Sequence, residues 1–154
     1  MKSHIVFDYS QITDHIFIGT NFCCQAHFNE ELVKKGVNAD ISLEENSESP
    51  LGVNSFLWLP TKDEHSPTQQ QLLLGSVAID LLIETGNKIY VHCRNGHGRA
   101  PTLVAAYFIS QGKPLKEAIE LVKSKRSEIH LNKEQTEALK MFEKGEIKKT
   151  PCNC

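Results

Sequence analysis

The chain has 154 residues, which is enough for one domain with a substantial hydrophobic core. Hydrophobic residues make up 40% and charged residues 23%, and the formal net charge is −2, so the composition is that of an ordinary globular domain and gives no basic field for nucleic acid. No apolar run approaches the length that spans a bilayer and no signal-peptide pattern opens the chain, so we expect no transmembrane segment.

The first half of the chain predicts short strands with one helix between them. Residues 12–19 alternate in polarity and end in glycine, which indicates a first strand or two. Residues 25–35 have helical spacing and stop at Gly36. Two further strands are expected at 37–43 and at 56–59, the second ended by Pro60.

The second half is mainly helical. Helices are predicted at 68–84, 101–111, 115–125 and, after the capping residue Asn132, through Glu143, with a strand at 88–91. Strands alternating with helices imply an α/β fold: a layered sheet with a parallel core flanked by helices. We expect one domain over residues 1–147 and a short flexible tail over 148–154.

The segment between the strand at 88–91 and the following helix carries the strongest chemical signal. It reads HCRNGHGR, from His92 to Arg99. A glycine-bearing loop between a strand and a helix directs its N–H groups and the helix N-terminus at one point, which forms an anion site. Such a field lowers a thiol pKa, so Cys93 is a candidate nucleophile, and Arg99 can hold two phosphate oxygens side by side. A lone cysteine at a strand end is usually a small buried hydrophobe, but here every neighbouring feature favours phosphoryl transfer through a cysteinyl-phosphate.

This chemistry bears on cofactors and compartment. Nucleophile, anion cradle and clamp come from the chain itself, so no metal and no cofactor is expected. Five cysteines without regular spacing argue against a disulfide scaffold. A thiolate nucleophile needs a reducing environment, so we expect a cytoplasmic protein.

Phosphate removal also needs an acid that protonates the leaving oxygen. Asp63 is the best candidate, because it follows a strand on a loop bounded by Pro60 and Pro67. Glu64 and His65 compete for the role, and many surface-loop aspartates are merely solvated.

The loop resembles the signature of the cysteine-dependent protein tyrosine and dual-specificity phosphatases. The spacing of Pro60, Asp63 and Pro67 is similar to the acid loop of the small dual-specificity members. The run GRAPTLVAAYFI resembles the phosphatases of regenerating liver, and KSKRSEIHLNKEQ resembles the closing helices of such enzymes. The resemblance implies the cysteine-phosphatase fold and a protein phosphatase acting on phosphotyrosine, with phosphoserine and phosphothreonine as further substrates. It also implies that the nucleophile is Cys93, the clamp Arg99, the acid Asp63, the loop-positioning residue His92, and the substrate-binding residues Arg94, Asn95, Gly96, His97 and Gly98.

Two positions affect how fast such an enzyme turns over. Most family members carry Ser or Thr after the arginine, and its hydroxyl helps the cysteine leave; here the residue is Ala100, and Thr102 is too far along to replace it. A slow phosphatase that acts mainly as a binding module is therefore an alternative function, whereas the other interpretation makes Ala100 a small helix-packing residue. Gln135 falls where some members place a glutamine on the attacking water, but an exposed helix glutamine is an equal interpretation.

The substrate and partners have alternatives as well. Basic residues at the positions of Arg94 and His97 resemble phosphoinositide and phosphatidylglycerophosphate phosphatases, which suggests a polyanionic substrate, although loop side chains often face solvent. Otherwise we expect a monomer that binds phosphorylated protein or peptide and no nucleic acid. The pair Cys152 and Cys154 resembles a doubly prenylated end, but an unmodified tail is favoured; Cys23 and Cys24 fit buried packing roles.

Overall fold

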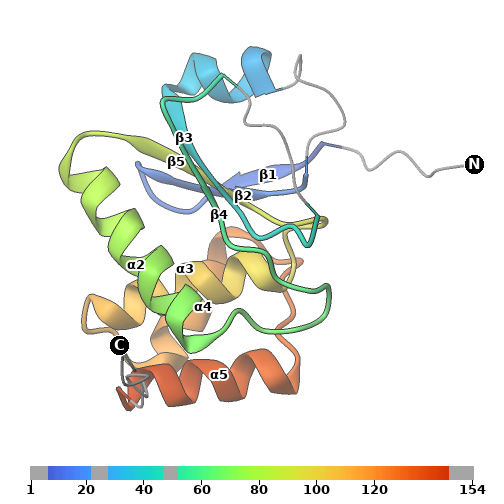
Figure 1. Cartoon of the computed structure of the whole chain (residues 1–154), viewed down its shortest axis with the longest axis vertical. Coiled ribbons are helices and arrows are strands. Elements are labelled where there is room, and N and C mark those ends of the chain that lie inside the picture. The colour runs from blue at the N-terminus through green and yellow to red at the C-terminus, as the bar shows by residue number, and fades with distance from the viewer. Residues whose placement is uncertain (1–6, 22–27, 47–51, 146–154) are drawn as a thin grey trace, which may run out of the picture.

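The computed structural model describes residues 7–21, 28–46 and 52–145, and its centre is a five-stranded sheet in the order β1-β2-β5-β3-β4. The first pair of strands is antiparallel and the others are parallel, which confirms the predicted layered sheet with a parallel core (Figure 1). The strands are β1 (Tyr9–Gln11), β2 (Ile16–Gly19), β3 (Val37–Ser42), β4 (Ser55–Trp58) and β5 (Lys88–His92).

Helices cover one face of this sheet. They are α2 (Gln69–Glu84), α3 (Arg99–Ser110), α4 (Leu115–Lys125) and α5 (Lys133–Glu143). The main core lies between them and the sheet, and α3 is its centre, with nearly every residue buried. Because successive strand residues point to opposite faces, Ile89 and Val91 join this core while Tyr90 joins a smaller cluster on the other face. Leu32 packs in that smaller cluster from two short helical turns, η1 (Phe28–Leu32) and η2 (Val33–Lys35).

Most element boundaries follow local chemistry. Thr68 and Asn132 each cap a helix through a capping box, and α4 and α5 begin and end where the sequence predicts. The helix α3 begins at Arg99 rather than at residue 101, because Gly98 serves as its N-cap. The first strand begins at Tyr9, upstream of the predicted range 12–19.

The predicted helix at 25–35 is only partly described. Its described part is the short η1 and η2 turns, which end at Gly36 in a left-handed conformation with φ 85°. Residues 22–27 lie outside the described residues, and so do Cys23, Cys24 and the tail at 148–154.

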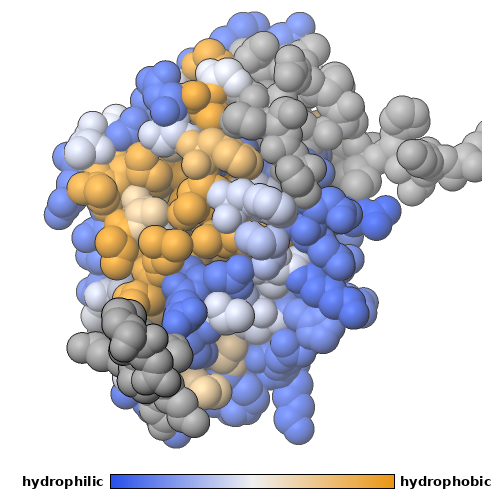
Figure 2. All heavy atoms as spheres, in the orientation of Figure 1, coloured by the Kyte–Doolittle hydropathy of each residue, from blue (hydrophilic) through white to orange (hydrophobic). Residues whose placement is uncertain are grey.

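One helix face remains apolar at the surface. Leu74, Val77 and Leu81 on α2 are each more than half exposed, and Figure 2 shows a hydrophobic area over this helix. Within the described ranges, however, none of the helices combines the length and hydropathy needed to cross a bilayer.

Candidate active site

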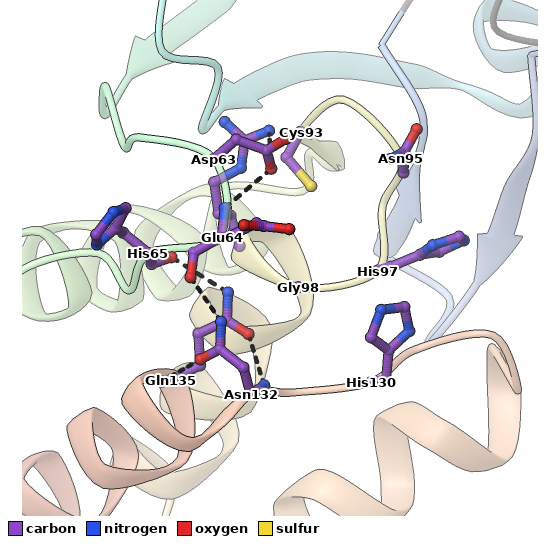
Figure 3. Close-up of a pocket in the computed structure, with 11 residues that line it drawn as sticks. Asp63, Glu64, His65, Cys93, Asn95, His97, Gly98, His130, Asn132 and Gln135 are labelled. Atoms are coloured by element: carbon purple, nitrogen blue, oxygen red, sulfur yellow. Dashed lines mark hydrogen bonds and ion pairs between the residues drawn. The ribbon is translucent and has the colours of Figure 1, made fainter.

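A cavity of about 550 Å³ opens where the parallel strands end, and its size is typical of a small-ligand site. Three segments meet there: the loop after β4, the loop between β5 and α3, and the segment that leads into α5 (Figure 3). The lining residues are Asp63, Glu64, His65, Cys93, Asn95, His97, Gly98, Arg99, His130, Asn132 and Gln135. The structure thus brings together the predicted nucleophile, clamp and acid.

Cys93 lies at the end of β5, where the strand gives way to the loop. Its thiol is free and only 3% of the residue is exposed, so it forms the floor of the cavity. The helix α3 starts directly after the loop, and no side chain caps its N-terminus. The first N–H groups of α3 are therefore available to an anion beside the sulfur, as the sequence predicts.

The shape of the loop depends on Gly96 and on a buried arginine. Gly96 has φ 68°, and a Cβ there would lie 2.7 Å from the carbonyl oxygen of Gly19. From outside the loop, Arg126 donates hydrogen bonds to the carbonyls of Gly96 (2.9 Å) and Asn95 (3.2 Å). Since the carbonyl and the next N–H of a peptide point in opposite directions, holding the carbonyls outward turns the following N–H groups inward. Arg126 carries no local sequence signal for this role, because its partners in the loop lie 30 and 31 residues away along the chain.

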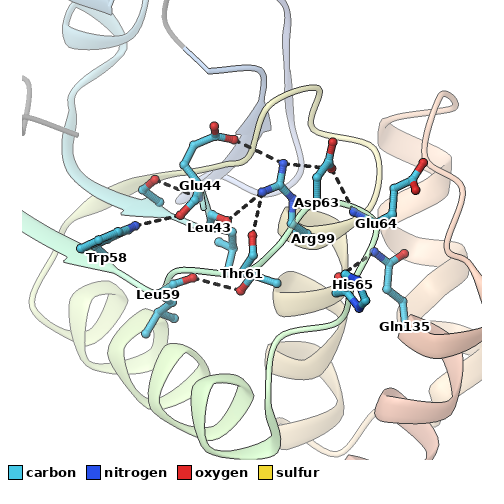
Figure 4. Close-up of polar contacts among 11 residues, drawn as sticks. Leu43, Glu44, Trp58, Leu59, Thr61, Asp63, Glu64, His65, Arg99 and Gln135 are labelled. Atoms are coloured by element: carbon cyan, nitrogen blue, oxygen red, sulfur yellow. Dashed lines mark hydrogen bonds and ion pairs between the residues drawn. The ribbon is translucent and has the colours of Figure 1, made fainter. Parts of the chain in front are cut away.

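Arg99 is buried, and both terminal nitrogens of its guanidinium contact oxygen atoms of neighbouring residues (Figure 4). One terminal nitrogen donates to the carbonyls of Leu43 (3.2 Å) and Thr61 (2.9 Å). The other contacts two carboxylates, those of Asp63 at 3.1 Å and Glu44 at 3.4 Å. The backbone bonds fix the position of the guanidinium, while the carboxylate contacts are the ones that a phosphate group can replace.

Both candidate acids reach the cavity, but only one touches the clamp. Asp63 is about half exposed, and its carboxylate also accepts a hydrogen bond from the N–H of Glu64 at 3.0 Å. Glu64 has a left-handed backbone with φ 63°, and its carbonyl accepts a hydrogen bond from Asn132. The geometry favours Asp63 as the acid, and the role itself stays a prediction.

The helix α5 holds the acid loop from the side. Glu134 accepts a hydrogen bond from the N–H of Ser66 at 3.1 Å and contacts the ring of His65 at 3.2 Å. The hydrogen bond from Ser66, followed by the contact with His65, lowers the pKa of the Glu134 carboxyl. The loop after β4 is therefore tied to the first turn of α5.

Gln135 is 2% exposed and lines the cavity, so the interpretation of an exposed helix glutamine is wrong. Its side chain accepts from the N–H of Asn132 and donates to the carbonyl of His65 at 3.1 Å. The capping box formed by Asn132 and Gln135 fixes the side chain of Gln135 at the start of α5, and the packing of α5 beside the acid loop places it in the cavity.

The remaining loop residues divide into two groups. The side chains of Asn95 and His97 line the cavity, whereas Arg94 is exposed and is not among the lining residues. The ring of His97 lies 5.5 Å from that of His130, a cavity residue that sequence analysis missed. Burial, followed by the charges of Arg126 and His130, lowers the pKa of His97.

Three residues around the loop are buried and are not among those that line the cavity. His92 is fully buried behind it, and Ala100 is fully buried in the main core. The hydroxyl of Thr102 donates to the carbonyl of Gly98 at 2.7 Å, so it is already in use, in agreement with the expectation that it does not replace a hydroxyl at position 100. Among the described residues, no group of three or more His, Cys, Asp or Glu side chains is arranged to hold a metal ion.

Comparisons with known proteins agree with this geometry. A rat dual specificity protein phosphatase 5 is 34% identical over 79 residues, covering 50% of this chain and 21% of that protein. Mouse phosphatidylglycerophosphatase and protein-tyrosine phosphatase 1 is 43% identical over 60 residues, covering 38% of this chain and 31% of that protein. The chain thus spans a third or less of the length of these two relatives.

A crystal structure of PTPMT1 superimposes with a TM-score of 0.79 at 28% identity, covering 90% of this chain and 95% of that chain. Another structure of PTPMT1, in complex with PI(5)P, superimposes with a TM-score of 0.77. Residues 16–145 match the family model described as dual specificity phosphatase, catalytic domain. The chain therefore belongs to the dual specificity phosphatase catalytic-domain family.

Proposed function

We propose that this protein hydrolyses phosphate monoesters through a cysteinyl-phosphate intermediate. Its substrates are proteins or peptides that carry phosphotyrosine, and also those that carry phosphoserine or phosphothreonine. The observation that carries the proposal is the meeting of Cys93, Arg99 and Asp63 in one cavity at the N-terminus of α3. Family membership and the relatives' names support the same reaction class.

In the first step the thiolate of Cys93 attacks phosphorus, an S–P bond forms and the P–O bond to the leaving group breaks. Asp63 gives its proton to the leaving oxygen. The loop N–H groups of residues 94–99 and the guanidinium of Arg99 hold the non-bridging oxygens, where negative charge lies throughout. His92 supports the loop from behind.

In the second step a water oxygen attacks phosphorus, the S–P bond breaks and the thiolate is restored. The Asp63 carboxylate takes the proton of this water, and inorganic phosphate leaves. Gln135 holds this water in the proposed step, and its position in the cavity next to Gly98 supports that role. These roles need only residues of the chain.

A second candidate substrate is a phosphoinositide or another polyanionic phosphate. The cavity extends from Cys93 past His97 to His130, so a second acidic group could meet two imidazole rings. The likeness to PTPMT1, one of whose structures holds PI(5)P, also favours this candidate. Parallel assays with a phosphotyrosine peptide and with PI(5)P in mixed micelles separate the two substrate classes.

A third candidate is a slow phosphatase that acts mainly as a binding module, which Ala100 favours because it supplies no hydroxyl beside the sulfur. Steady-state turnover of an aryl phosphate supports an enzyme, and a single stoichiometric burst supports the binder. In either case we propose a monomer working in the reducing cytoplasm, where Cys93 remains a free thiol.

The reaction is tested with Cys93→Ser. A serine hydroxyl is far less acidic than a thiol, so this variant should lose turnover of an aryl phosphate while keeping its fold by circular dichroism. The natural protein should be equally active with a chelator present. Full activity of Cys93→Ser, or activity that requires added divalent metal, rules out the mechanism.

A further inference from the structure

Asp40 is a carboxylate in the interior of the sheet. It lies in β3, next to the central strand β5, and is only 2% exposed. Its Oδ1 atom lies 3.0 Å from Nε2 of His92, which is fully buried and directly precedes Cys93. The two atoms are within ion-pair distance but are not aligned as in a good hydrogen bond. The attraction between them is therefore mainly electrostatic. Burying a carboxylate is costly unless an opposite charge compensates it.

The groups around Asp40 leave His92 as its compensating partner. Asp40 pairs in register with Tyr90, whose ring stacks on His92 at 5.4 Å. Burial, and after it the charge of Asp40, raises the pKa of Tyr90 well above its usual value, so this phenol stays neutral and donates its hydrogen to the carbonyl of Thr20. Asp40 also pairs in register with Phe56 on β4, while His92 pairs with Gly19 on β2 and Ser42 on β3, and none of these three is charged.

Two further charged groups act on the buried residues around Asp40. Arg126, at the end of α4, and Cys93, at the start of the loop after β5, both act electrostatically on the Tyr90 hydroxyl. Arg126 is already paired with Asp8 at 2.9 Å. Cys93 as a thiolate is itself negative. Among the described residues, the imidazole of His92 is the group in direct contact with Asp40 that can carry a balancing positive charge.

We propose that Asp40 is a positioning residue that keeps His92 protonated, so that a buried Asp40–His92 ion pair stands behind Cys93 and holds the nucleophile as a thiolate. His92 directly precedes Cys93 in the chain, so the positive field of its imidazolium adds to that of the α3 N-terminus at the sulfur. Without the carboxylate, a fully buried imidazole favours its neutral form. The sulfur then loses a nearby cation.

The inference rests on the proposed role of Cys93, but its test does not need turnover. Iodoacetamide alkylation of the Cys93 peptide, followed by mass spectrometry across pH, reports the thiolate whether or not the protein hydrolyses any substrate. Imidazole ¹⁵N NMR reports the protonation of His92, with its signal assigned by comparison with His92→Asn. The variant is Asp40→Asn, which keeps shape and removes charge. Its control is Asp14→Asn, which removes one negative charge from an exposed position.

In the natural protein and in Asp14→Asn, His92 should be protonated at neutral pH. In Asp40→Asn the imidazole should be neutral there, and the midpoint of the Cys93 alkylation profile should move up by about one pH unit. Unchanged alkylation and unchanged His92 protonation in a folded Asp40→Asn overturn the proposal. A neutral His92 in the natural protein at neutral pH overturns it as well, so the test stands even where Asp40→Asn fails to fold.

Discussion

The guanidinium of Arg99 lies 3.1 Å from the carboxylate of Asp63, so the proposed clamp and the proposed acid contact each other before any substrate arrives. We expect a phosphate dianion that enters the cavity to compete with Asp63 for this nitrogen, while the bonds to the carbonyls of Leu43 and Thr61 keep the guanidinium in place. We expect substrate binding to release Asp63 toward the leaving oxygen. The same contact distinguishes Asp63 from Glu64, which lines the cavity without touching Arg99.

Asp63→Asn should therefore slow an alkyl phosphate much more than an aryl phosphate with a very good leaving group. Only the poor leaving group needs a proton in the transition state, and general acid catalysis typically contributes about 10²- to 10⁴-fold. The measurement is kcat/KM for both substrates, with Glu64→Gln as the matched control. Equal slowing of both substrates by Asp63→Asn, or a larger effect of Glu64→Gln, would assign the acid elsewhere.

Ala100→Ser should raise the steady-state rate and shrink the burst of product. The natural protein has no hydroxyl at this position, and the hydroxyl of Thr102 is bonded to the carbonyl of Gly98. A hydrogen bond to a charged group is worth about 1.5–3 kcal/mol, so its absence slows release of the thiolate from phosphorus by about 10- to 100-fold. Rapid-quench kinetics measures burst and turnover together. Absence of a burst in the natural protein, with no gain in Ala100→Ser, would mean that Ala100 only packs in the core.

Gly96→Ala should destabilise the protein more than Gly98→Ala. At Gly96 the new Cβ meets backbone, the carbonyl of Gly19, in a left-handed conformation that alone costs about 1–2 kcal/mol. At Gly98 the nearest atom, at 2.9 Å, belongs to the side-chain amide of Gln135, which can shift. Urea denaturation of both variants should rank them in this order. The reverse order would contradict the close packing of the loop against β2.

The stability of the natural protein should depend on the protonation of His97. The folded state lowers the pKa of His97 below the ordinary 6.5, through burial and then through the charges of Arg126 and His130. The unfolded chain therefore binds the proton more readily, and the free energy of unfolding falls as the pH drops below about 6.5. This loss of stability is complete once the pH is below the pKa of His97 in the folded state, and it is absent at clearly alkaline pH.

His97→Gln removes this loss of stability. Between about pH 7.5 and about pH 5.5 the variant should lose less stability than the natural protein, as measured by urea denaturation at both pH values. The histidines other than His130 are common to both proteins and cancel in the comparison, whereas His130, whose charge acts on His97, belongs to the same effect. Equal losses in the two proteins would mean that His97 is not held in its neutral form.

The sequence by itself determined the features that depend on short stretches of chain. The capping residues Thr68 and Asn132 and the turn at Gly36 set element ends through local hydrogen bonds and backbone sterics. The order of strand, loop and helix around Cys93 placed the predicted nucleophile at an anion site, because that site is built from consecutive peptide groups.

Only the tertiary structure decided which distant residues complete this site. Arg126 reaches the loop from the end of α4, and Asp40 reaches His92 across neighbouring strands, through contacts that no sequence period encodes. Gln135 points inward because α5 packs beside the acid loop, although one helix face alone allows either orientation. Charge and burial at these positions arise when separate segments meet, so packing of the sheet against its helices sets them.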